Sequence, residues 1–388
     1  MPDPRERPNM ARRTTAVVVG AGVAGTTTAL SLRREGLDVT LVDAWEPGHP
    51  GAASGGEHRI LRSSHGTDEF YAQLSREGRL GWLELGEQTS EELFVQCGAV
   101  MLAKEGNTAW EDASKKTLER LGIPHFVAPA HELPVRLPVM KADDIAYGLW
   151  EPEAGFVYAQ RAVQAAVRQF LREGGKLRRA RVVTDEAERP LLDGKPIAAD
   201  VVVMACGAWM SGLFPRTLRR HLDVVRQNVI MIATPPGETG YDHTEFPCWI
   251  DHGNGAYGIP AAGGFGFKAV LVWRQLHIDL DREDRIVDET SIARTRRYLA
   301  ARFPGLADQP ISQMAVSQIA NTADTHFMID RHPEHRGMVL VAGDSGHLLK
   351  HGMAIGRFVA GLALERHETD ERFRIRDRSS VDLASRPQ

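Results

Sequence analysis

One segment near the start of the chain constrains its fold more than any other. Residues 16–19 are apolar and mostly β-branched, and they run directly into Gly20-Ala21-Gly22-Val23-Ala24-Gly25, which has the spacing G-x-G-x-x-G. A stretch compatible with a helix follows over 26–35, and a second short strand over 39–42 ends at Asp43. This complete βαβ unit, with an acidic residue closing its second strand, predicts a dinucleotide-binding site.

Each part of this unit has a physical reason. The first glycine permits a tight turn, the second lets the backbone approach a pyrophosphate, and the third allows a helix to pack closely on a strand. Free N–H groups at the start of the helix favour phosphate oxygens. Asp43 would accept hydrogen bonds from ribose hydroxyls. A glycine-rich turn without a ligand is the alternative, and the intact context makes it the weaker one.

Composition excludes several other classes of protein. The chain has 388 residues and a formal net charge of −4, so we expect neither nucleic acid nor an acidic membrane surface as a partner. No apolar stretch reaches the ~20 residues that a membrane helix needs. The charged, proline-bearing tail 1–13 does not resemble a signal peptide, and the three cysteines include no C-x-x-C pair. We therefore expect a cytoplasmic protein with reduced thiols. The scarcity of lysine relative to arginine indicates a GC-rich bacterial genome.

The pattern of elements predicts an α/β fold with a discontinuous nucleotide domain. Buried, parallel-type strands that enter glycine turns recur at 199–209 and 338–347, whereas 223–281 is strand-patterned with many turns. We expect a Rossmann-like dinucleotide-binding domain from 12–90, 155–215 and 322–388. A second, mainly antiparallel-sheet substrate domain would come from 91–154 and 216–321.

Motifs along nearly the whole chain resemble one family of flavoproteins. They include Arg59-Ile60-Leu61-Arg62, Cys206-Gly207-Ala208-Trp209, Arg226-Gln227, Gly263-Gly264-Phe265-Gly266-Phe267-Lys268, His326-Phe327-Met328-Ile329-Asp330, His332-Pro333-Glu334-His335 and Gly343-Asp344-Ser345-Gly346-His347-Leu348-Leu349-Lys350. Together with the βαβ unit, they resemble the monomeric sarcosine oxidase and N-methyltryptophan oxidase family, within the glycine/D-amino-acid oxidase class. The resemblance implies FAD as the dinucleotide. It also implies hydride removal from the carbon beside an amine, giving an imine, with oxygen reduced to hydrogen peroxide.

The same resemblance assigns roles to individual side chains. Lys268 matches the family's oxygen-activating lysine, whereas taken alone it reads more readily as a strand lysine with its stem along apolar neighbours. Arg62 and Lys350 match the carboxylate clamp, and Arg59 and His347 fall beside the flavin. Tyr257 is a candidate substrate contact, although a core position is equally compatible. The residues expected to bind the cofactor are Gly20, Gly22, Val23, Ala24, Gly25, Asp43, Ala44, Ser54, Arg59, Ile60, Val182, Gly207, Trp209, Gly343, Asp344, Gly346, His347, Leu348, Leu349 and Lys350.

Four departures from the family pattern bear on the cofactor linkage and on specificity. Ser317 stands where covalent members carry the cysteine that links the flavin, so we expect non-covalent FAD. Ile319 replaces an active-site tyrosine, and Val272 replaces a histidine. Asp344 replaces an aromatic residue, and it could favour a second amine or hydroxyl on the substrate or pair with an arginine. We expect a substrate other than sarcosine.

These observations favour an FAD-dependent amine or amino-acid oxidase acting on a carboxylate-bearing, N-substituted or free amino acid. One alternative is a dehydrogenase or a biosynthetic tailoring enzyme of the same fold that does not use oxygen. A non-catalytic flavin-binding redox sensor and an NAD-dependent enzyme are weaker alternatives. We expect a monomer with no metal site, and His326, His332 and His335 read as structural residues because they lack metal-ligand spacing.

Overall fold

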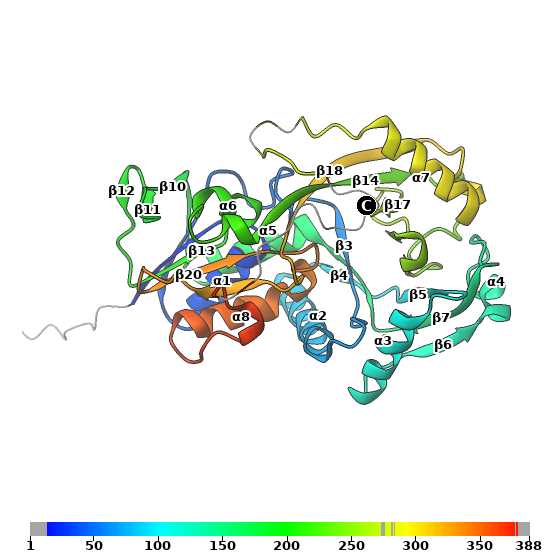
Figure 1. Cartoon of the computed structure of the whole chain (residues 1–388), viewed down its shortest axis with the longest axis horizontal. Coiled ribbons are helices and arrows are strands. Elements are labelled where there is room, and N and C mark those ends of the chain that lie inside the picture. Colours follow the sequence, from blue (N-terminus) through cyan, green and yellow to red (C-terminus); the bar gives the residue numbers. More distant parts are fainter. Residues whose placement is uncertain (1–13, 273–275, 281, 283, 377, 379–388) are drawn as a thin grey trace, which may run out of the picture.

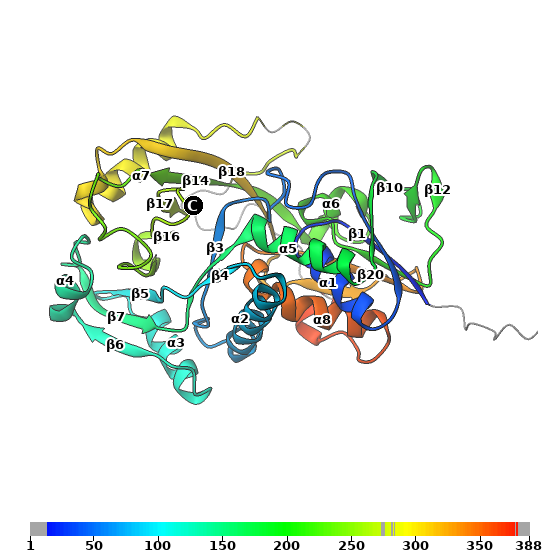
Figure 2. The same ribbon diagram turned by 180° about the vertical axis from the view of Figure 1, so that it is seen from behind.

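A computed structural model describes residues 14–272, 276–280, 282, 284–376 and 378. The tail 1–13 and parts of the segments 223–281 and 322–388, on which some expectations fall, lie outside these ranges. Within them, none of the helices has the length and apolarity needed to cross a bilayer. The chain folds as the predicted α/β protein, with two large sheets in opposite halves of the molecule (Figures 1 and 2).

The βαβ unit lies at the centre of the first half. Strands β1 (Thr15–Val19) and β2 (Asp38–Asp43) pair in parallel and are joined by α1 (Val23–Arg34). They belong to a six-stranded sheet in the order β19-β20-β13-β1-β2-β9. The remaining strands are β9 (Lys176–Arg179), β13 (Val201–Met204), β19 (Met328–Arg331) and β20 (Met338–Ala342), of which β19 runs antiparallel to β20. The helices α1, α2 (Glu69–Thr89), α5 (Ala159–Arg172) and α8 (Gly352–Ala363) pack together on one face of this sheet (Figure 1).

The second half is built on an eight-stranded sheet in the order β18-β14-β17-β16-β15-β5-β7-β6. Its neighbouring strands are antiparallel except for β5 and β15, which run parallel. The strands are β5 (Ala99–Lys104), β6 (Phe126–Pro129), β7 (Ile145–Glu151), β14 (Asp223–Ile232), β15 (Cys248–Asp251), β16 (Ala256–Ile259), β17 (Phe267–Leu271) and β18 (Ile311–Asn321). The helices of this half are α3 (Ala109–Arg120), α4 (Leu133–Arg136) and α7 (Glu289–Arg302).

Smaller elements complete the fold. Strands β3 (His58–Leu61), β4 (Phe94–Val95) and β8 (Gly155–Tyr158) form a three-stranded antiparallel sheet. Strands β10 (Val182–Thr184), β11 (Pro190–Leu192) and β12 (Lys195–Pro196) form another, and α6 (Met210–Leu213) follows β13. After Arg179 the chain leaves the six-stranded sheet and enters the sheet of β10, β11 and β12, which is called the small sheet below. We propose that the two large sheets mark the two domains at the predicted boundaries.

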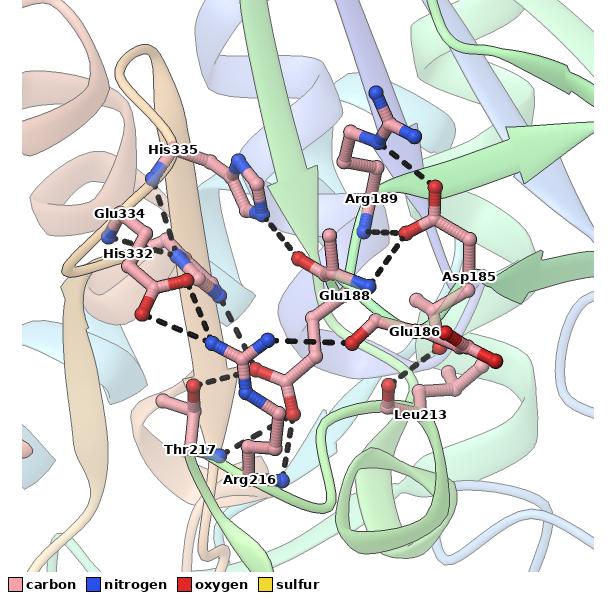
Figure 3. A network of polar contacts seen from close by, with 12 residues as sticks. Asp185, Glu186, Glu188, Arg189, Leu213, Arg216, Thr217, His332, Glu334 and His335 are labelled. Carbon is pink, nitrogen blue, oxygen red and sulfur yellow. Dashed lines mark hydrogen bonds and ion pairs between the residues drawn. The ribbon is translucent and has the colours of Figure 1, made fainter.

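A buried carboxylate fastens the small sheet to the rest of the first half (Figure 3). Glu188 lies in the turn between β10 and β11 with a φ of 59°. Its carboxylate accepts hydrogen bonds from the backbone N–H groups of Arg216 (2.6 Å) and Thr217 (3.2 Å) and from the Thr217 hydroxyl (2.5 Å). His332 lies on the other side, with its Nε2 atom 3.4 Å from the carboxylate. The Nδ1 atom of His332 accepts from two backbone N–H groups, so Nε2 carries the proton, and His332 is a structural residue as expected.

Replacing Glu188 by alanine should lower the free energy of unfolding by about 2–4 kcal/mol, because it leaves several buried donors unpaired. Burial works to raise the pKa of this carboxyl, but the hydrogen bonds from Thr217 and Arg216 outweigh it and lower the pKa. The contribution of the ionised Glu188 carboxylate to the free energy of unfolding is therefore present at neutral pH, and it disappears as the pH falls through the pKa of Glu188 in the folded protein. Urea titrations of both proteins at pH 7 and in acid measure the difference. The exposed neighbour Glu186, changed to alanine, is the control and should shift stability by less than about 0.5 kcal/mol.

Candidate active site

One cavity of about 850 Å³ lies between the two large sheets. The turns that follow β1, β13 and β20 line it from the six-stranded side, at the carboxyl ends of three neighbouring parallel strands. Strands β15, β16, β17 and β18 contribute residues from the eight-stranded side. Ligands in open α/β sheets bind beyond the carboxyl ends of the strands, so this is the expected position for a nucleotide.

Glycine is required by geometry at the two ends of the first turn. Gly20 has a φ of 104°, and a Cβ atom there would lie 2.3 Å from the carbonyl oxygen of Ala205. A Cβ atom on Gly25 would lie 1.8 Å from the carbonyl oxygen of Gly20, so this residue permits α1 to pack against β1. Between them, the start of α1 lies open to the cavity, with the Ser54 hydroxyl 3.1 Å from the backbone N of Val23.

Asp43 lies at the end of β2, where the sequence predicts it. Its carboxylate accepts hydrogen bonds from the backbone N–H groups of Ala21 (2.5 Å) and Trp45 (2.8 Å), which fix its orientation at the cavity wall. A carboxylate has further acceptor sites, so ribose hydroxyls can still donate to it. The glycine turn, the open helix start and this acid together fit the adenosine and pyrophosphate parts of FAD.

Lys268 comes from β17 and lines the cavity from the eight-stranded side. The side chain is 2% exposed, and its Nζ atom donates a hydrogen bond of 2.9 Å to the backbone carbonyl of His58. Burial, together with the positive charge of Arg59, lowers the pKa of Lys268 to about 7. A buried ammonium whose protonation changes near neutral pH is a candidate for a functional group.

Arg62 and Lys350 both line the same cavity. The guanidinium of Arg62 donates to the backbone carbonyl of Ser64 and lies 5.0 Å from the centre of the Trp110 ring, so two neighbours fix its direction. Lys350 is buried, and this burial holds its pKa well below the usual value, with a smaller contribution from the positive charge of Arg62. Two neighbouring cationic groups in one cavity would be stabilised by a bound anion.

Three imidazoles surround Lys350, and two of them, His65 and His351, were missed by the sequence analysis. The Nε2 atom of His65 lies 2.7 Å from the Lys350 Nζ, while its Nδ1–H points to the carbonyl of Ser63 at 3.0 Å. The Nδ1 atom of His347 lies 3.5 Å from Nε2 of His351. Burial and the charge of Lys350 hold the pKa values of His65 and His351 well below the usual range and lower that of His347 to about 3.

The nitrogen atoms of His65, His347 and His351 lie within 4.8 Å of one another, a spacing that could hold a metal ion. The positive charges of Lys350 and Arg62 beside them work against a cation at this point. We therefore interpret the three side chains as a neutral hydrogen-bonding network around the Lys350 ammonium.

Asp344 lines the cavity, but its carboxylate is engaged by the backbone rather than by an arginine. The carboxylate accepts hydrogen bonds from the N–H groups of Ala320 (3.0 Å) and Gly346 (2.9 Å). Burial raises the pKa of this carboxyl. The geometry adds a role that the sequence analysis did not consider, which is to join β18 to the turn after β20, and the contact of Asp344 with substrate stays a prediction.

His252 is a cavity residue that the sequence analysis missed. It lies in the turn between β15 and β16, and its Nδ1 atom is 3.0 Å from the carboxylate of Glu111, which is buried in α3. The Trp110 ring centre lies 4.1 Å from that of His252, and the Arg62 guanidinium lies 5.0 Å from the same Trp110 ring. The available signal was the His-Gly-Asn-Gly turn five residues before Tyr257, but nothing in the sequence pairs it with Glu111.

The predicted site residues converge on the cavity, with one exception. Those that line it are Gly20, Gly22, Val23, Ala24, Asp43, Ala44, Ser54, Arg59, Ile60, Arg62, Val182, Gly207, Trp209, Tyr257, Lys268, Val272, Ile319, Gly343, Asp344, Gly346, His347, Leu348, Leu349 and Lys350. Gly25 is not among the lining residues, because it lies behind the turn against β1. Ser317, at the position expected for a flavin-linking cysteine, also lines the cavity.

Comparison with known proteins gives a match along most of the chain. The sequence profile of the FAD dependent oxidoreductase family (DAO) matches residues 15–362. Monomeric sarcosine oxidase of Bacillus sp. (strain B-0618) is 28% identical over 367 residues, which cover 90% of this chain and 91% of that protein. Peroxisomal sarcosine oxidase of Homo sapiens is 27% identical over 365 residues, which cover 90% and 92% of the two chains.

Among solved structures, L-proline dehydrogenase from P. horikoshii superposes with a TM-score of 0.80 at 20% sequence identity. The superposition covers 92% of this chain and 95% of that one. At this level of identity the likeness shows a common fold.

Proposed function

Because the chain belongs to the DAO family of FAD-dependent oxidoreductases, which act on C–N bonds, we propose that it oxidises a carboxylate-bearing amine with oxygen as the electron acceptor. Bound FAD would take a hydride from the carbon beside the nitrogen, leaving an imine, and return the electrons to oxygen as hydrogen peroxide. We further propose a cytoplasmic monomer. The observation that carries the proposal is that the buried Lys268 lines the same cavity as Arg62 and Lys350.

The chain's own residues supply binding, orientation and charge. Arg62 offers a forked donor and Lys350 a point charge to the substrate carboxylate. The apolar surface of the cavity excludes water from the reacting carbon. The Lys268 ammonium stabilises the negative charge that develops when electrons reach oxygen.

The walls of the cavity bear on which amine is accepted. Ile319 and Val272 present apolar surface to the cavity, whereas His252 presents an imidazole whose Nδ1 is held by Glu111. When Nδ1–H donates to this carboxylate, Nε2 is left as an acceptor. We propose that the preferred substrate is larger than sarcosine and carries a hydrogen-bond donor beyond the reacting amine.

An anaerobic panel of amino acids and N-substituted amino acids, each mixed with the yellow holoenzyme, tests the function. We expect a carboxylate-bearing amine to bleach the flavin, and admission of air to restore the colour with release of hydrogen peroxide. Pairs of compounds with and without a side-chain hydroxyl or amine test the contribution of His252. Bleaching by amines that lack a carboxylate, without bleaching by any acid, would contradict the proposal.

The same experiment separates the oxidase from a dehydrogenase. The L-proline dehydrogenase fold shows that this architecture also serves an enzyme named for dehydrogenation. If the flavin is bleached by an amino acid but recovers in air only over many minutes, and recovers at once with an artificial electron acceptor, the dehydrogenase is correct.

FAD should be bound without a covalent link, because the Ser317 hydroxyl cannot form a thioether to the flavin. Precipitating the purified yellow protein with acid should release all of the colour into the supernatant. Colour that stays in the pellet would contradict this expectation. His58, the first alternative attachment residue to examine in that case, is fully buried beside the rings of Phe156 and Phe265 and does not line the cavity.

A further inference from the structure

Two cysteines that are far apart in the sequence lie in contact in the eight-stranded sheet. Cys97 lies two residues before β5, and Cys248 is the first residue of β15. Their Sγ atoms are 3.8 Å apart, although 151 positions separate them along the chain. Both are free thiols, with Cys97 half-buried and Cys248 fully buried.

The backbone fixes this arrangement from both sides. Cys248 pairs with Ala99 in the parallel register of β15 and β5, and its backbone N–H donates to the carbonyl of Gly98 at 3.1 Å. Gly98 donates in turn to the carbonyl of Ala154 at 2.9 Å. Because the two main chains are already joined by hydrogen bonds, rotation of the side chains is the movement needed to bring the sulfurs to the disulfide distance of about 2.05 Å.

The two thiols have different environments. The hydrogen bond with Cys248 lowers the pKa of the half-buried Cys97 thiol, whereas burial holds the pKa of Cys248 well above its usual value. Thiolate character and access to solvent determine which cysteine reacts with an oxidant. Cys97 is therefore the attacking thiol, and Cys248 is the partner that resolves the product.

The pair also lies close to the proposed site of oxygen reduction. Cys248 and Ile250 are two residues apart on one strand, so their side chains share a face of the sheet, and Ile250 lines the cavity. In the same sheet, Lys268 on β17 pairs with Ile259 on β16, and β16 is the neighbour of β15. Peroxide formed beside Lys268 would thus arise in the same sheet as Cys248, two strands away.

We propose that Cys97 and Cys248 are a modification site, a dithiol that hydrogen peroxide oxidises to a disulfide. The Cys97 thiolate attacks one oxygen of the peroxide, the O–O bond breaks, and hydroxide leaves and takes up a proton as water. The thiol of Cys248 then attacks the sulfenic sulfur of Cys97, the disulfide forms, and a second water leaves. The two thiols lose two electrons and two protons, and one peroxide becomes two waters.

The test uses the reduced holoenzyme and added hydrogen peroxide, so its result does not depend on whether the protein is itself an oxidase. Thiol titration of the unfolded protein should fall from three cysteines to one, and intact mass should drop by two hydrogens. A peptide pair linking Cys97 to Cys248 should appear in the digest, and dithiothreitol should restore three thiols.

Matched variants separate this pair from general oxidation. Cys97→Ser and Cys248→Ser should each abolish the linked peptide, and Cys248→Ser should leave a sulfenic acid on Cys97 that dimedone traps. Cys206→Ser should still form the disulfide, because the sulfur of Cys206 contacts the backbone of Val19 rather than another thiol. A wild-type titre that stays at three thiols, or oxidation of Cys97 beyond the sulfenic acid while Cys248 stays free, would overturn the proposal.

Discussion

Replacing Lys268 by methionine should slow the reoxidation of reduced flavin by oxygen roughly 10²–10³-fold, the usual cost of removing one preorganised electrostatic contact. Reduction of the flavin by substrate should change much less, because the ammonium is needed only when negative charge appears on oxygen. Methionine keeps the length and volume of the apolar stem, so the variant should fold normally. Stopped-flow measurement of the two half-reactions separates the effects.

The pH dependence gives an independent check. Burial lowers the pKa of Lys268 to about 7, and the charged form lies on the acid side of this value. The reoxidation rate of the wild-type protein should therefore fall as the pH rises through the lysine pKa, which an adjacent reduced flavin anion would move upward. The reoxidation rate of the methionine variant should not fall with pH in this way. The control is Lys176→Met, because Lys176 is an exposed lysine paired with Asp38, and this variant should behave as wild type. Equal, small effects of Lys268→Met on both half-reactions would place the Lys268 side chain away from the flavin.

Replacing Arg62 by alanine should weaken the binding of the carboxylate-bearing substrate by roughly 2–4 kcal/mol, or about 30–1000-fold. The forked guanidinium gives up two charge-assisted hydrogen bonds, and Lys350 remains as a single donor. The dissociation constant for flavin reduction should rise strongly for the acid and change little for the same amine without its carboxylate.

Two further variants sharpen this result. Arg62→Lys keeps the charge but loses the fork, so its effect should lie between those of alanine and wild type. The control is Arg181→Ala, because Arg181 lies at the nucleotide end of the same cavity, 5.6 Å from the ring centre of Trp45. This variant should keep the preference for acids once FAD saturates the protein. If Arg62→Ala raises the dissociation constants of the acid and of its decarboxylated analogue equally, Arg62 supports the loop after β3 instead.

The parts that the sequence predicted well are those in which a short segment carries its own reason. The βαβ unit needs glycine at Gly25 because a Cβ there would lie 1.8 Å from the carbonyl oxygen of Gly20 in the same turn, and at Gly20 because its φ is 104°. Such a constraint is local, so it is visible as a motif. The turn after β20 is similar, since its glycines bring a run of residues to the cavity.

The parts that the sequence missed depend on contacts between distant segments. The structural role of Asp344 depends on β18, which brings the N–H of Ala320 to within 3.0 Å of its carboxylate. His252 becomes notable only because α3 supplies Glu111, and His65 only because Lys350 lies beside it. These side chains acquire their chemistry from partners that no local spacing reveals.

The strand order of the six-stranded sheet has a consequence for synthesis of the protein. Strand β1 ends at Val19, but β20, which lies beyond β13 in the same sheet and carries the last turn of the cavity, begins at Met338. At about 5–20 residues per second, a nascent chain would wait on the order of tens of seconds between making these two strands. During this time α8 is not yet present to pack on α1, so the part of α1 that α8 covers stays exposed. The glycine turn after β1 thus becomes part of the complete cavity only after β20 and its turn have been synthesised, so FAD binding must wait for a segment that follows much later in the chain.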